Sequence, residues 1–119
     1  MEQVLFIETG MGIDVHGQDV NEAASRAVKD AIHYNSIPGI RTILPDNDLN
    51  NMRVHIKLAV PMDKEKLDKE KIRALIPYGK VTVEVMDGGM VSSSGIILKD
   101  QGDKNDLMYI VNAVIEVGY

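Results

Sequence analysis

The sequence contains no cysteine and no tryptophan among its 119 residues, and aromatic residues make up only 4% of it. Without cysteine the chain forms no disulfide, no thiolate metal site and no cysteine nucleophile. With so few aromatic side chains, the hydrophobic core has to be built from Val, Ile, Leu, Met and Ala.

Basic residues and long apolar runs are also scarce. There are 13 Lys and Arg against 18 Asp and Glu, which gives a formal net charge of -5. Duplex binding requires clustered cations on the phosphates, so we expect no nucleic-acid partner. No segment approaches the roughly 18 consecutive apolar residues of a membrane helix, and the first residues include no basic signal region. We therefore expect a cytoplasmic protein that makes no membrane contact.

What remains is an ordinary globular composition, with 45% hydrophobic and 26% charged residues. A chain of this length buries roughly two-thirds of the surface that it exposes when unfolded, so it needs no covalent staple. We expect a single domain over residues 1–119.

The stretch from Gly10 to Asp19, GMGIDVHGQD, is the most distinctive in the chain. It follows a short apolar run and precedes an amphipathic helix, which predicts a strand–loop–helix junction. The free N–H groups of a first helical turn favour an anion, and glycines let the backbone approach a ligand closely. We expect a site for a small polar molecule, with ligand-binding residues Gly10, Gly12, Gly17, Asp19 and Arg26.

Asp14 and His16 lie two residues apart, so in an extended segment their side chains point to the same side. A carboxylate there could orient the imidazole for acid–base catalysis, or both residues could bind a divalent metal. A metal site generally needs three or four ligands, and only these two are close in sequence. The alternative is structural: glycines in a tight turn and an aspartate that caps the helix.

The glycine spacing does not predict a nicotinamide or flavin cofactor. The dinucleotide fingerprint needs a third glycine, and Val15 stands in its place.

A second candidate segment is Met90 to Gly95, which contains Ser92, Ser93 and Ser94. Serines beside glycines can bind a carboxylate or phosphate, or supply a nucleophile, and they also mark polar loops and edge strands. His33, near the end of the first helix, is interpreted as a residue that interacts with the helix dipole. His55 is expected on the solvent face of its strand.

Hydrophobic periodicity predicts the secondary structure. The expected strands cover residues 3–9, 40–44, 52–60, 81–86 and 107–117, and the expected helices cover 19–34 and 63–76, with an extended segment at 90–99. The strands at 40–44 and 52–60 are expected to form a hairpin. This order predicts an α+β fold with a ferredoxin-like β-α-β-β-α-β antiparallel sheet, helices on one face and a C-terminal strand extension. Because both faces of 107–117 are apolar, we expect a second subunit to cover one of them in a homo-oligomer.

The string G-x-G-x-D-x-H-G, present from Gly10 to Gly17, is followed by D-x-x-x-A-A-x-R-A-V-x-D-A-I. Together they resemble the signature of a conserved hypothetical family named after a Listeria locus. That resemblance implies a family without an assigned function. The serine run is similar to the serine–glycine segments of ring-opening amidohydrolases of the cyanuric acid hydrolase type. In that much longer, three-domain family a serine–lysine pair acts on a cyclic amide.

These residues support three hypotheses of different classes. The first is a hydrolase or isomerase of a small carboxylated or cyclic-amide compound, in which His16 is the acid or base, Asp14 orients it and backbone N–H groups stabilise an oxyanion. The second is a non-enzymatic metal- or ligand-binding oligomeric module. The third is a structural interaction protein.

Overall fold

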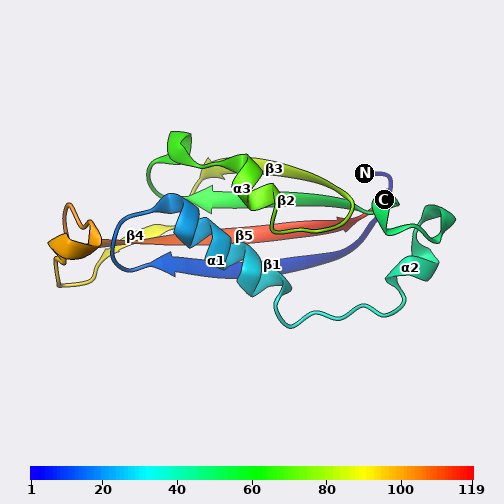
Figure 1. The fold of residues 1–119 in the computed structure, drawn as a ribbon, viewed down its shortest axis with the longest axis horizontal. Helices are drawn as coiled ribbons and strands as arrows, with labels where there is room; N and C mark the ends of the chain where they lie inside the picture. Colours follow the sequence, from blue (N-terminus) through cyan, green and yellow to red (C-terminus); the bar gives the residue numbers. More distant parts are fainter.

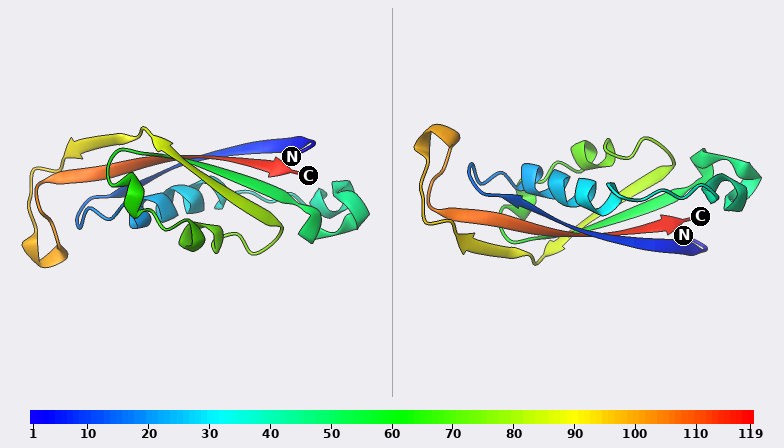
Figure 2. Two further views of the ribbon diagram at one scale, coloured as in Figure 1. Left: turned by 90° about the horizontal axis from the view of Figure 1, so that it is seen from above. Right: turned by 90° about the horizontal axis from the view of Figure 1, so that it is seen from below.

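The computed structural model describes residues 1–119 and has an α+β fold with a five-stranded mixed sheet (Figures 1 and 2). The strands are β1 (Val4–Asp14), β2 (Arg53–Val60), β3 (Lys80–Asp87), β4 (Met90–Ser93) and β5 (Leu107–Gly118). The helices are α1 (Val20–Ile32), α2 (Ile40–Ile43) and α3 (Lys69–Arg73). Helices α1 and α3 pack on one face of the sheet, and α2 lies beyond its end. None of them has the length and apolarity needed to cross a bilayer. The molecule is elongated, with extents of 52 × 26 × 21 Å.

The long strand β5 is the centre of the sheet. The strand order is β1-β5-β2-β3, and β4 pairs with β5 as well. β1 pairs along one edge of β5, while β2 and then β4 share the other edge, all antiparallel to it. The expected strand at 107–117 is confirmed. α1 covers one of its two faces.

The ferredoxin-like arrangement is not confirmed, because β2 and β3 are parallel neighbours. The expected strand at 40–44 is wrong: Ile40–Ile43 is the short helix α2. β5 and β3 occupy both edges of β2, so no edge is left for a hairpin partner. A parallel pair instead needs a crossover, which the segment containing α3 supplies.

The helix expected at 63–76 is divided in two. A 3-10 turn covers Lys64–Lys66, and α3 begins after Asp68, whose side chain accepts hydrogen bonds from the next turn's backbone N–H groups. The extended segment at 90–99 ends as a strand at Ser93, where β4 finishes.

The core lies between α1 and the sheet. The buried face of α1 is mostly alanine, which lets the helix axis approach the strands closely. The sheet contributes Val54, Ile56, Leu58, Val60, Val111, Ala113, Ile115 and Val117 to this core, and α3 adds Ile72.

The opposite face of the sheet has no helix over it (Figure 2). Large apolar side chains remain exposed on it: Ile7 is 60% exposed, Met11 51% and Met90 60%. The other half of the same face, around the start of β2, carries polar and charged side chains.

Candidate functional site

The sequence predicted that Gly10 and Gly12 lie in a loop. In the structure they lie inside β1, under α1. A Cβ atom added to Gly12 would lie 2.1 Å from the carbonyl oxygen of Ala23, and one added to Gly10 would lie 2.3 Å from that of Ala27. Such distances are far inside van der Waals contact. These two glycines therefore serve the packing of α1 on the sheet, and the expectation that they bind a ligand stays a prediction.

The turn itself covers the residues between β1 and α1. Gly17 has φ = +102° and Gln18 has φ = +51°, so the chain reverses through the left-handed region. Glycine takes that conformation without the strain that a Cβ brings. Asp19 then caps α1 by accepting hydrogen bonds from the N–H groups of Asn21 at 2.9 Å and Glu22 at 3.4 Å.

Asp14, the last residue of β1, stabilises this turn by accepting a hydrogen bond from it. Its carboxylate accepts a hydrogen bond from the N–H of Asp19 at 2.9 Å and lies 3.3 Å from the guanidinium of Arg26. Arg26 also donates to the carbonyl of Ile13 and pairs with Glu22, one turn earlier in α1, at 3.3 Å. Asp14 thus adds to the capping of α1, and the guanidinium of Arg26 contacts its carboxylate.

His16 is not paired with Asp14. Its Nδ1 lies 2.6 Å from Oδ2 of Asp103, and the other oxygen of Asp103 accepts from the N–H of Gly17 at 2.6 Å. Asp103 also accepts from the N–H of Leu98. The hydrogen bonds from Gly17 and Leu98, together with His16, hold the pKa of the Asp103 carboxyl below its ordinary value. Asp103 is therefore the carboxylate that orients His16, and the expected Asp14–His16 pair is wrong.

The expected divalent metal on Asp14 and His16 has no support in this geometry. The two side chains point to different partners, and no group of three or more His, Cys, Asp or Glu residues gathers anywhere in the structure. A carboxylate that accepts a backbone N–H and faces an arginine is already satisfied without a metal.

A second contact joins the turn to the loop before β5. The side-chain amide of Gln18 donates to Asn105 and to the carbonyl of Leu107, and its oxygen accepts from the N–H of Lys104. Gln18 therefore ties the turn to a loop that lies 86 to 89 residues further along the chain. This contact positions Lys104 next to the start of α1.

A cavity of about 280 Å³ opens at this point, beside the N-terminus of α1. Its lining residues are Gly17, Gln18, Asp19, Val20, Asn21, Asp63, Lys66, Lys104 and Tyr109. Of the expected site residues, Gly17 and Asp19 line it, whereas Gly10, Gly12, Asp14, His16 and Arg26 do not. Of the motif, only its last three residues, Gly17 to Asp19, line the cavity.

The cavity combines two cations, Lys66 and Lys104, with the carboxylates of Asp19 and Asp63 and a buried phenol. Lys66 lies 3.9 Å from Asp63, while Lys104 has no carboxylate within 4.0 Å. The hydroxyl of Tyr109 donates to Asp63 at 3.3 Å. Burial and the negative charge of Asp63 raise the pKa of Tyr109, so the phenol stays protonated and remains a hydrogen-bond donor.

Sequence reasoning missed Asp63, Lys66, Asp103, Lys104 and Tyr109. Lys66 belongs to a charge-rich segment that is typical of a solvated helix face, and Asp103 and Lys104 belong to a polar loop. The one available signal was Tyr109, a polar aromatic residue on the inward face of an otherwise aliphatic strand.

The serines do not join this cavity. Ser93 donates to the carboxylate of Asp106, and Ser94 donates to the carbonyl of Ile96. Both hydroxyls thus stabilise the turn after β4. This agrees with the interpretation of the serines as part of a polar loop or edge strand. Ser92 lies within β4, opposite Met108 of β5.

These features define an α+β protein with a mixed sheet and a helix-capping turn tied to a distant loop. The chain belongs to a family of conserved hypothetical proteins, Lin0512_fam, whose model matches residues 4–117. The resemblance drawn from the N-terminal motif is therefore confirmed. No curated protein matches the chain.

The structure is also similar to that of an FtsZ-like protein of unknown function from Nostoc punctiforme. The two chains are 38% identical, the match covers 97% of this chain and 93% of the other, and the TM-score is 0.80. The shared fold therefore extends over nearly the whole of both chains.

Proposed function

We propose that this protein binds a small molecule bearing a carboxylate or a similar anionic group in the cavity at the N-terminus of α1. The observation that carries the proposal is the position of Lys66 and Lys104, which both line a cavity at the first turn of a 13-residue helix. The partial positive charge of a helix N-terminus adds to that of the two ammonium groups.

The size and polarity of the cavity narrow the class of ligand. A volume of about 280 Å³ lies just below the usual range for small-molecule sites, roughly 300 to 1,000 Å³, which favours a compact ligand. Tyr109 and Asn21 offer hydrogen-bonding groups at the edge of the cavity, and Asp63 offers a negative charge. A small polar acid, with its carboxylate on the lysine side, fits this distribution.

The experiment is a titration of isotope-labelled protein with succinate and acetate at low salt, followed by the amide resonances of residues 17–21. We expect saturable shifts there, and Lys104→Gln should weaken binding about fivefold to tenfold because a charge-assisted hydrogen bond is lost. Lys29→Gln is the matched control: Lys29 is exposed on α1 and lies outside the cavity. Equal weakening in both variants would show that only net charge matters and would reject the site.

A second candidate function, acid–base catalysis, is favoured by the 2.6 Å contact between His16 and Asp103. An ionised carboxylate only accepts, so Nδ1 carries the proton and Nε2 is left as the base. We propose His16 as the proton acceptor in hydrolysis or isomerisation of a small carboxylated or cyclic-amide compound. The expected result is that His16→Asn abolishes turnover of such a compound while succinate binding is retained. Unchanged turnover would leave the binding function alone.

We also propose that the protein forms a homo-oligomer through the apolar half of the uncovered sheet face. The support is the exposure of Met11, Met86 and Met90 on that half. Exposed apolar patches of this kind mark interaction sites. Light scattering at micromolar concentration is expected to give a multiple of 13.1 kDa, and Met11→Lys together with Met90→Lys should return the monomer mass. A monomer in the unmodified protein contradicts the proposal.

A further inference from the structure

The polar half of the uncovered sheet face carries charges that are matched almost everywhere. Lys57 lies opposite Glu84 in the β2–β3 register, and its ammonium is 2.8 Å from Glu116 of β5. His55 lies opposite Glu116, and its Nε2 is 3.0 Å from Glu84. Opposite charges across neighbouring strands stabilise a sheet, and this part of the face follows that rule.

Arg53 and Lys80 break the rule. They are direct partners in the β2–β3 register and lie on the same face as His55 and Lys57. Neither has a carboxylate within 4.0 Å, so their two positive charges face each other without compensation. Like charges directly opposite destabilise a strand pair. This end of the sheet therefore carries two cations that no carboxylate contacts directly.

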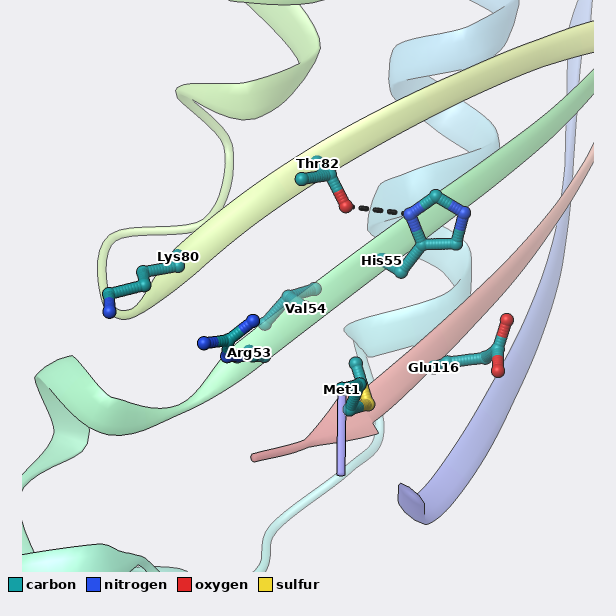
Figure 3. Close-up of a pocket in the computed structure, with 7 residues that line it drawn as sticks. All are labelled: Met1, Arg53, Val54, His55, Lys80, Thr82 and Glu116. Carbon is teal, nitrogen blue, oxygen red and sulfur yellow. Dashed lines mark hydrogen bonds between the residues drawn. The ribbon is translucent and has the colours of Figure 1, made fainter. Parts of the chain in front are cut away.

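A cavity of about 300 Å³ lies beside these two cations (Figure 3). Arg53 and His55 come from β2, and Lys80 and Thr82 come from β3, so the four side chains border one space. The hydroxyl of Thr82 is 2.6 Å from Nδ1 of His55, which fixes the imidazole between Thr82 and Glu84. Glu116 also borders the cavity, where Lys57 satisfies its charge by a hydrogen bond and keeps its pKa below the ordinary value.

A second cavity of about 220 Å³ borders the same two cations on another side. Glu2 and Asp46 line that second cavity, so it already contains acidic groups. The first cavity instead offers the donors of Arg53 and Lys80 together, while the hydroxyl of Thr82 donates to Nδ1 of His55. An added anion is therefore better placed in the first cavity than in the second.

We propose that Arg53 and Lys80 form a binding site for the phosphate group of a small molecule. Two uncompensated positive charges match a phosphate, which carries about −1.5 to −2 charges near neutral pH, better than the single charge of a carboxylate. The planar guanidinium of Arg53 donates two parallel hydrogen bonds to such a group, and Lys80 adds a point charge. This site is separate from the cavity at α1 and does not depend on the function proposed for that cavity.

The test is a titration of isotope-labelled protein with inorganic phosphate, glycerol phosphate and acetate, in a buffer free of other anions of these classes. We expect both phosphates to shift the amide resonances of residues 53–55 and 80–82 in a saturable way. Arg53→Gln and Lys80→Gln should each raise the Kd about tenfold, because each removes a charge-assisted contact. Tighter binding of glycerol phosphate would identify an ester as the ligand, and tighter binding of inorganic phosphate would identify the free ion.

The matched control is Lys69→Gln, which removes one charge from an exposed lysine at the start of α3, outside both cavities. Its Kd is expected to equal that of the unmodified protein. An equal loss of binding in Lys69→Gln, acetate binding as tight as phosphate binding, or the absence of saturable shifts would each overturn the proposal.

Thermal unfolding gives a readout that does not depend on ligand identity. Without phosphate, Arg53→Gln and Lys80→Gln should raise the Tm by about 2 °C, because each removes the repulsion between the two cations. Added phosphate should raise the Tm of the unmodified protein and leave that of the variants nearly unchanged. A lower Tm in both variants without phosphate would mean that the cations stabilise the free fold, which contradicts the proposal.

Discussion

Gly10 and Gly12 lie in β1 beneath α1, whereas residues 15–19 form the turn that follows, and different forces hold these two parts of one motif. The glycines are in place because no side chain fits between the strand and the backbone of the helix. The turn is in place because Asp14, Asp19 and Asp103 accept hydrogen bonds from it. Added volume at the glycines should therefore lower the free energy of unfolding by the same amount at any pH. Changes at the turn should alter the free energy of unfolding in a way that depends on pH and little on volume.

The contrast is sharpest for Gly12→Ala, the variant with the largest expected effect. The added Cβ would lie 2.1 Å from the carbonyl oxygen of Ala23 and 2.3 Å from the backbone nitrogen of Ala27, so α1 itself would have to move. Overpacking against backbone that cannot relax should lower the free energy of unfolding by about 3 kcal/mol or more. Urea denaturation measures the loss, which should be the same near pH 5 and pH 8.

The control for this variant is Thr9→Ser, three positions earlier in β1. Thr9 is exposed on the face of the strand that points away from α1, so the loss of its methyl group should change the free energy of unfolding by about 0.5 kcal/mol or less. Equal losses in the two variants would mean that both positions of β1 are packed alike, and the distinction between the faces would be wrong.

The local elements of the fold were predictable from sequence, while the arrangement of the sheet was not. The alternation of residues 53–60 and the alanine-rich arc of α1 are properties of neighbouring residues, so pattern alone predicts them. The pairing of β2 with β3 and β5 is decided by contacts between distant segments. The short stretch Ile40–Ile43 has apolar residues of strand type, and only the occupied edges of β2 exclude it from the sheet.

The candidate site divides in the same way. The sequence indicated Asp19 as a helix cap and Gly17 as a turn residue, because both roles depend on the nearest few residues. It did not indicate that Asp103 would take the place of Asp14 beside His16. The two residues are 87 positions apart, and no spacing rule links them. The polar contacts that build a site are mostly of this long-range kind.

Asp103→Asn is expected to have the next largest effect, and here the effect should depend on pH. Folding lowers the pKa of the Asp103 carboxyl below its ordinary value of 3.8. Its charged form therefore stabilises the fold fully above pH 3.8, and this stabilisation is lost as the pH falls through the lower pKa of the folded protein. The difference in unfolding free energy between the unmodified protein and Asp103→Asn should therefore be largest near neutral pH and shrink below about pH 4. Urea denaturation from about pH 7 to about pH 3 measures it.

A difference that stays constant over this range would show that the charge of Asp103 contributes nothing and that its hydrogen bonds alone hold the turn. A difference that grows as the pH falls has the wrong sign for a lowered pKa. Lys99→Gln is a suitable companion variant, since Lys99 lies in the same loop and makes no ion pair within 4.0 Å.

The smallest effect is expected for Asp19→Ala, which separates capping from surface charge at the start of α1. The variant removes the acceptor for two N–H groups of the first turn and should cost about 1 kcal/mol of unfolding free energy. Glu22→Gln in the same turn only weakens an exposed pair with Arg26 and should cost about 0.3 kcal/mol, most of it lost in high salt. The Asp19 effect should persist in salt, because it rests on unsatisfied backbone donors rather than on net charge. If salt abolished both effects equally, the turn would be held by long-range charge, and its hydrogen bonds would not distinguish it from the rest of the helix surface.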